Sequence, residues 1–152
     1  MTSYFEKWFW AKRRGIGPLS AQEAEERHRS GRAYVAVFVD DGVKRVIDFA
    51  SPWVSVTFLD PFERPFLQYD FKKNQNSVLF LSLVRHTEFN GDGKDPKETA
   101  TFSFKEDGSL LIENMDHEAG TASEKETSFD PQDNKEPYPM FGEYGSVARL
   151  DR

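Results

Sequence analysis

The sequence predicts a mainly β protein of the α+β class. We expect an antiparallel barrel or a strongly bent sheet of about 6–8 strands, with one N-terminal helix packed against it. Three observations support this expectation. From residue 33 to residue 115, short stretches with a two-residue apolar period follow one another. Turn signals rich in Gly, Asp and Pro separate them. Only residues 20–30 carry the flanking residues of a well-capped helix.

Length and composition indicate one domain over residues 1–152, with 14 Phe, 5 Tyr and 3 Trp to build its core. The chain contains no cysteine, which excludes a disulfide framework, a thiolate nucleophile and a cysteine-ligated zinc site. Its first residues lack the pattern of a signal peptide, and no stretch approaches the roughly 20 apolar residues of a membrane span. We therefore expect a cytoplasmic protein with no membrane partner.

The helix at residues 20–30 is predicted from both of its ends. Ser20 followed by Glu23 forms a capping box, and Gly31 is placed to end the helix in the left-handed conformation. The preceding aromatic segment, residues 4–14, fits either an amphipathic helix or a strand, and its residues do not distinguish the two. Residues 15–18 contain two glycines and a proline and are expected to break whatever precedes them.

Two hairpins have assignable turns. Residues 33–40 and 43–50 are joined by Asp41-Gly42, which predicts a two-residue turn and a hairpin with two apolar faces. Residues 98–105 and 109–115 sort apolar from polar side chains only if the loop has three residues, so Gly108 is expected to be the left-handed residue of a bulge. Three further strands are predicted between the hairpins, at residues 53–59, 66–71 and 77–89.

Residues 116–139 are predicted to be a long acidic surface loop or a partly disordered segment. Residues 113–136 carry eight Asp/Glu against two Lys, while the whole chain has a net charge of −6. Such a surface disfavours nucleic acid and attracts a basic protein. The candidate partner-binding residues are the carboxylates of this segment: Asp116, Glu118, Glu124, Glu126, Asp130 and Asp133.

No motif predicts a cofactor, a metal site or a catalytic residue. The three histidines lack the spacing of a metal site, although His86 and Glu88 would share one face of a strand. The serines lack a nucleophile-elbow pattern, and Gly15-Ile16-Gly17 lacks the third glycine of a dinucleotide fingerprint. Residues 90–95 fail the pattern of a calcium loop.

The leading functional hypothesis is a non-catalytic protein-binding module. Its most specific form is an immunity or inhibitor protein that neutralises a basic toxin or effector by occlusion. The alternative is a lipocalin-like β-barrel, whose abundant aromatic side chains would line a cavity for a small apolar ligand. A third hypothesis is a hydrolase that uses His86 with a carboxylate.

Overall fold

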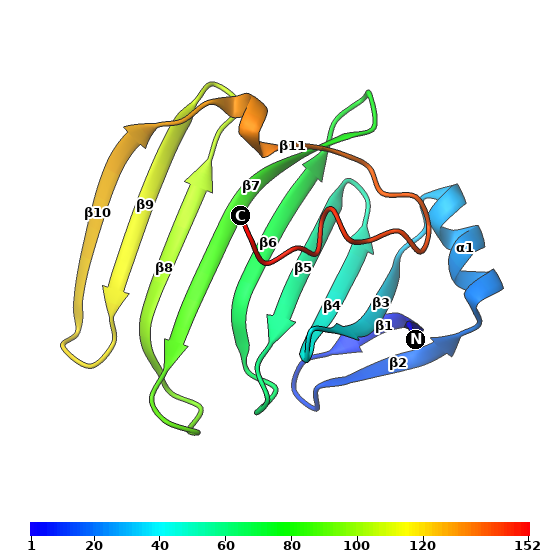
Figure 1. Ribbon diagram of the computed structural model, residues 1–152, viewed down its shortest axis with the longest axis horizontal. Helices are drawn as coiled ribbons and strands as arrows, with labels where there is room; N and C mark the ends of the chain where they lie inside the picture. The colour runs from blue at the N-terminus through cyan, green and yellow to red at the C-terminus, as the bar shows by residue number, and fades with distance from the viewer.

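The computed structural model describes residues 1–152 and contains one antiparallel sheet of eleven strands, one α-helix and one 3-10 helix (Figure 1). In chain order the elements are β1 (Ser3–Phe9), β2 (Arg14–Leu19), α1 (Ala21–Ser30), β3 (Tyr34–Asp40), β4 (Val43–Ala50), β5 (Trp53–Leu59), β6 (Pro65–Lys73), β7 (Val78–Phe89), β8 (Pro96–Phe104), β9 (Ser109–Asp116), β10 (Thr121–Ser128), η1 (Pro131–Asn134) and β11 (Lys135–Pro137).

The sheet is open, with β10 and β2 at its two ends; β3–β10 form a meander, and β1 lies between β3 and β2. Its order is β10-β9-β8-β7-β6-β5-β4-β3-β1-β2, and β11 pairs with the start of β7. The prediction of a mainly β fold with one helix is confirmed. The barrel option was wrong, because β10 and β2 at the two ends of the sheet do not pair with each other. The count of about 6–8 strands was also wrong, because β1, β2, β10 and β11 come from segments that the apolar period does not mark.

Both predicted hairpin turns are confirmed. Asp41 and Gly42 both have positive φ, 49° and 73°, and Val37 pairs with Val46. Two residues with positive φ are what a type I′ turn requires. In the second hairpin Gly108 has φ 92°, and Phe104 pairs with Leu110. These turns fix which side chains of β3, β4, β8 and β9 share a face.

Helix α1 has the predicted ends. The Ser20 hydroxyl accepts the Glu23 N–H at 3.1 Å, and the Glu23 carboxylate accepts the Ser20 N–H at 2.8 Å. Gly31 ends the helix with φ 73°. Only Ala24 is buried, so α1 is a surface helix that packs along a narrow edge. It contacts β1, β2 and β3 at one end of the sheet.

The core lies between the sheet and the C-terminal segment. Residues 138–152, which we call the tail, cross one face of strands β3–β7 in Figure 1 (red). We call this the front face. Tyr144 and Val147 of the tail are buried there against side chains of the sheet. The sheet residues of this core are Tyr34, Ala36, Ile47, Phe49, Val54, Val56, Phe58, Tyr69, Phe71, Leu79 and Leu81.

The N-terminal aromatic segment is a strand over most of its length. Tyr4 lies on the front face, where its ring stacks on Phe141 at 5.2 Å. Phe5 and Trp8 instead pack on a small cluster on the back face (Val35, Val37, Val46 and Leu59). Pairing of β1 with β3 on one side and β2 on the other decides this conformation, because the sequence alone permits helix or strand.

Residues 116–139 are not one long loop. They contain β10, η1 and β11, and all eight residues of β10 pair with β9. The prediction of a long loop or a partly disordered segment was wrong over β10, because β9 offers a free row of backbone donors and acceptors, and pairing satisfies them whatever the polarity of the added strand.

Candidate partner-binding surface

Strands β8, β9 and β10 extend past the core. We call residues 96–128 the wing. In Figure 1 neither the tail nor α1 lies over these three strands. Every residue of β10 is exposed, whereas the first four residues of β3 are buried. The wing therefore presents two faces and one edge to solvent.

The wing carries most of the negative charge of the protein. It holds eight Asp/Glu and three Lys, a net charge of −5, while the whole chain has −6. The remaining 119 residues are almost balanced. The acidity read from the composition is therefore a local property of three uncovered strands.

On the front face, three carboxylates lie in one row, one beside the wing and two within it. Glu88 of β7 pairs with Glu98 of β8, and Glu98 pairs with Asp116 of β9. The row borders a groove of about 440 Å³ that also includes His86 and Asn114. Like charges directly opposite each other on neighbouring strands destabilise a sheet. A cationic group placed over this row would relieve that repulsion.

The back face of the wing has a second acidic pair. Glu113 of β9 lies directly opposite Glu124 of β10, and Arg85 of β7 and Thr101 of β8 continue the same row. A groove of about 540 Å³ runs along it. Glu126 lies two residues further along β10 on the same face. The wing is therefore acidic on its back face at β9 and β10 and on its front face at β8 and β9.

The six carboxylates predicted from the sequence do not form one cluster. Asp116 lies on the front face, and its Oδ1 accepts the N–H groups of Glu118 and Ala119, both at 3.0 Å. Glu124 and Glu126 project to the back face. Asp130 caps η1 by accepting the Gln132 N–H at 3.0 Å, and Glu118 and Asp133 are exposed in the turn and in η1.

Glu88, Glu98 and Glu113 also belong to this acidic surface, although they were not predicted from the sequence. The sequence did show that the predicted strand at residues 77–89 ends in polar residues and that one face of the second hairpin is polar. It did not show that β7 pairs with β8 across the loop at residues 90–95. That pairing alone sets Glu88 opposite Glu98.

The histidines have three different environments. His28 is half-buried, and its Nε2 lies 2.9 Å from the Pro139 carbonyl oxygen while its Nδ1 lies 2.7 Å from the Tyr34 hydroxyl. His117 Nε2 lies 2.8 Å from Thr99 Oγ1 on the wing. His86 is exposed at the groove of the front face and forms no ion pair with Glu88.

A smaller groove of about 280 Å³ lies on the back face of the central strands, lined by Asp48, Thr57 and Trp10 among others. Burial raises the pKa of the Asp48 carboxyl. A general acid needs such a shift, but it also needs a second reactive group within hydrogen-bond reach. The groove supplies no histidine, lysine or second carboxylate.

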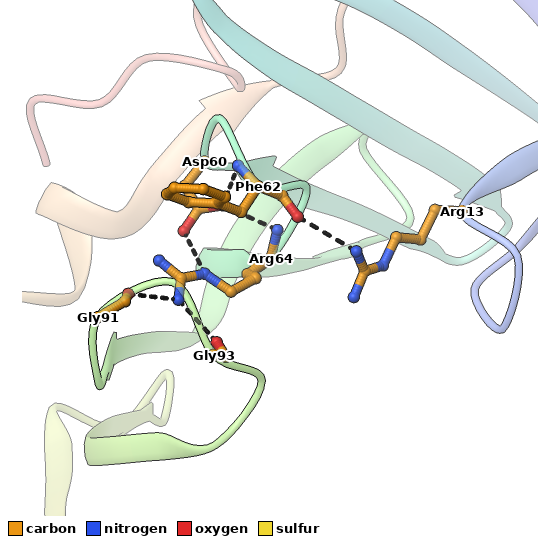
Figure 2. A network of polar contacts seen from close by, with 6 residues as sticks. All are labelled: Arg13, Asp60, Phe62, Arg64, Gly91 and Gly93. Atoms are coloured by element: carbon orange, nitrogen blue, oxygen red, sulfur yellow. Dashed lines mark hydrogen bonds and ion pairs between the residues drawn. The ribbon is translucent and has the colours of Figure 1, made fainter.

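A polar network away from the wing surrounds Arg64 (Figure 2). Its Nε donates to Asp60 Oδ2 at 2.7 Å, and its Nη1 donates to the Gly91 and Gly93 carbonyls at 2.8 and 2.7 Å. The guanidinium also lies over the Phe89 ring at 4.6 Å. Arg64 is buried, so this network ties the β5–β6 loop to the β7–β8 loop.

Asp60 is held as a carboxylate in this network. Burial alone would raise its pKa, but hydrogen bonds from the backbone and side chain of Arg64 and from the Phe62 N–H outweigh it and lower the pKa. Arg13 adds a hydrogen bond to the Phe62 carbonyl at 3.1 Å (Figure 2). Since the buried guanidinium donates to acceptors of the protein itself, we assign this network to stability.

Polar contacts also fix the tail. The Tyr69 hydroxyl donates to the Arg149 carbonyl at 2.9 Å, and Arg45 Nε donates to the Ala148 carbonyl at 2.8 Å. The Glu136 carboxylate, itself buried, pairs with Arg152 at 2.9 Å. The tail is thus an integral part of the core.

No group of three or more His, Asp or Glu side chains is placed to hold a metal ion. The one α-helix has ten residues, and the structure has no helix that qualifies as a membrane span. Comparison of the chain with protein-family models, with curated proteins and with solved structures finds no match.

Proposed function

We propose that this chain is a non-catalytic protein-binding module, and specifically an immunity or inhibitor protein that neutralises a basic toxin or effector by occlusion. The wing is the proposed binding surface. The observation that carries the proposal is that the part of the sheet left uncovered by the tail and α1 also holds nearly all of the net negative charge.

The arrangement of charge supports a protein partner. The carboxylates lie on both faces of the wing, in rows that extend across neighbouring strands. A surface of this kind accelerates encounter with an oppositely charged protein and disfavours acidic competitors. Such steering is strongest at low ionic strength, because the Debye length is about 30 Å at 0.01 M salt and about 8 Å at 0.15 M.

The apolar-ligand alternative has less support. The sheet is open, and its core face is filled by Tyr144, Val147 and neighbouring tail residues rather than left hollow. The hydrolase alternative rests on His86 and the carboxylates around the groove of the front face. No ion pair orients the His86 imidazole there.

The proposal is tested by partner capture followed by charge neutralisation. The partner is isolated from the native host by cross-linking to the intact chain, and its association rate is then measured at several salt concentrations. We expect a basic partner, and we expect the triple variant E98Q/E113Q/E124Q to associate at least about tenfold more slowly at low salt.

The matched control removes three carboxylates outside the wing. Glu25, Glu26 and Glu143 are exposed, and E25Q/E26Q/E143Q changes the net charge by the same amount. This control should slow association much less. Equal slowing by the two triple variants, or an acidic partner, would refute the wing as the binding surface.

A further inference from the structure

Strand β10 forms one free edge of the sheet. It pairs with β9 through all eight of its residues and has no neighbour on its other side. Figure 1 shows it as the outermost strand of the wing, remote from α1. A free strand edge is a template for another strand, because its outward backbone groups are unpaired.

The hydrogen bonds between β9 and β10 show which residues of β10 have N–H and C=O groups that face away from β9. Just past the strand, the Phe129 N–H donates to the Gly108 carbonyl at 3.0 Å, in the same register as the β9–β10 pairs. Antiparallel strands alternate inward and outward residues. Odd-numbered residues from 121 to 127 therefore bond to β9. The outward N–H and C=O groups belong to Ala122, Glu124, Glu126 and Ser128.

The backbone of the other free edge is interrupted, and that of β10 is not. Strand β2 contains Pro18, which has no N–H, and Gly17, whose φ is 69°. Proline and irregular backbone are common devices against strand addition. Strand β10 contains no proline and no residue with positive φ, and its register with β9 is unbroken.

Charges along β10 alternate between the two faces. Glu124 and Glu126 project to the back face, and Lys125 projects to the front face. Directly opposite residues of an added antiparallel strand would share those faces. Complementarity therefore requires a cation, an anion and a cation at three consecutive positions of the added strand.

We infer that β10 is the docking edge for an antiparallel strand of a partner protein, with Lys or Arg opposite Glu124 and Glu126 and Asp or Glu opposite Lys125. This inference rests on the proposed function, since it names how a basic protein would engage the wing. The outward N–H and C=O groups would supply affinity, and the three charges would set the register.

A second copy of this chain is a poor occupant of the edge. Two copies related by a two-fold axis perpendicular to the sheet keep their faces aligned, so residues of the same face must pair. The two longest such overlaps centre on Glu124 and on Lys125. The first sets Glu124 against Glu124 of the second copy. The overlap centred on Lys125 sets Lys125 of one copy against Lys125 of the other, and Glu124 against Glu126.

The test uses the full chain and two labelled eight-residue peptides, one with Lys-Glu-Lys and one with Glu-Lys-Glu at its centre, both flanked by Thr and Val. Fluorescence anisotropy at low salt measures the dissociation constants. We expect the Lys-Glu-Lys peptide to bind at least about tenfold more tightly. The charge-swapped variant E124K/K125E/E126K should reverse the preference.

A proline at an outward position tests the role of the backbone. Ala122→Pro removes an N–H that bonds to nothing in the protein, so the fold and the melting temperature should be retained. Binding of the Lys-Glu-Lys peptide should fall at least about tenfold. Ala122→Thr keeps the N–H and is the matched control, with the affinity of the parent chain.

Two results would overturn the inference: equal affinity for the two peptides, or unchanged peptide affinity in A122P. The natural partner separates this inference from the proposed function. If E98Q/E113Q/E124Q slows partner association but A122P binds the partner normally, the wing remains the binding surface and the edge role is refuted. If no basic partner is captured, the proposed function fails, whatever the peptides show.

Discussion

The Tyr34 hydroxyl donates a hydrogen bond to Nδ1 of His28 over 2.7 Å. The direction follows from the other ring nitrogen, because Nε2 faces the Pro139 carbonyl, which only accepts, and so must carry the proton. The Tyr34 oxygen in turn lies 3.2 Å from the Tyr144 hydroxyl. One half-buried imidazole therefore joins α1, β3 and the tail.

This geometry predicts a stability that falls in mild acid. Burial lowers the pKa of His28, and the hydrogen bond to Pro139 only partly opposes that effect. The unfolded state, with an ordinary histidine pKa of about 6.5, therefore binds the proton at higher pH than the folded state. The contribution of His28 to the free energy of unfolding is therefore complete at pH values above the unfolded-state pKa. It is lost as the pH falls from that pKa through the lower pKa of the folded state.

The measurement is urea unfolding of the parent chain and of His28→Gln at pH 8 and at pH 5. The destabilisation by His28→Gln should be larger at pH 8 than at pH 5, because protonation has already weakened the parent at the lower pH. His86→Gln, at an exposed position beside the groove of the front face, is the control. A destabilisation by His28→Gln that is independent of pH would contradict the prediction.

Loss of the Tyr34 hydroxyl should destabilise the protein by about 1–3 kcal/mol, because Tyr34→Phe leaves His28 Nδ1 and the buried Tyr144 hydroxyl without this partner. Tyr138→Phe is the matched control. Tyr138 packs on the same imidazole, with its ring 5.3 Å away, but its hydroxyl makes no hydrogen bond to His28, Tyr34 or Tyr144. Free energies of unfolding from urea titration compare the two, and equal losses would refute the role of the hydroxyl.

Arg64→Met should cost about 3–5 kcal/mol of stability, since it leaves the Asp60 carboxylate and two loop carbonyls without their donor. Arg13→Met removes only one hydrogen bond at the exposed rim of the same network and should cost less than about 1 kcal/mol. Thermal and urea unfolding distinguish the two variants. A cost of Arg64→Met as small as that of Arg13→Met would show that the loops do not depend on the guanidinium.

The order of charges at residues 124–126 of β10 predicts how substitutions there change dimerisation of the chain. In the register centred on residue 125, the double variant K125T/E126K removes the lysine pair and sets each Glu124 opposite the lysine introduced at position 126 of the other copy. It should therefore dimerise more readily than the parent chain. Lys125→Thr alone keeps the Glu124–Glu126 repulsion and should behave as the parent does. Sedimentation velocity over a range of protein concentrations tests this, and identical profiles for all three chains would contradict it.

Features that depend on near neighbours in the chain were predictable. The capping box of Ser20, the turn at Asp41-Gly42 and the bulge at Gly108 each follow from residues within a few positions of one another. Backbone conformation at such sites is set by side-chain hydrogen bonds and by glycine, and both are visible in the sequence. The hairpin registers followed from the turns.

Features that depend on pairing between distant segments were not predictable. β10 has the composition of a loop, with no apolar side chain larger than Ala122, and it is a strand because β9 offers it an edge. β1 and β2 form strands for the same reason, although glycine and proline interrupt the segment.

By itself, the sequence determined a mainly β chain with one capped helix, two hairpin registers and an excess of carboxylates toward its C-terminal half. Tertiary structure alone decided that the sheet stays open, that the tail packs on one face of its central strands and that neither the tail nor α1 covers β8–β10. The physical reason is that side-chain period and turn chemistry are local. Where the free edges lie, and which carboxylates meet across strands, follows only from the completed pairing of the whole sheet.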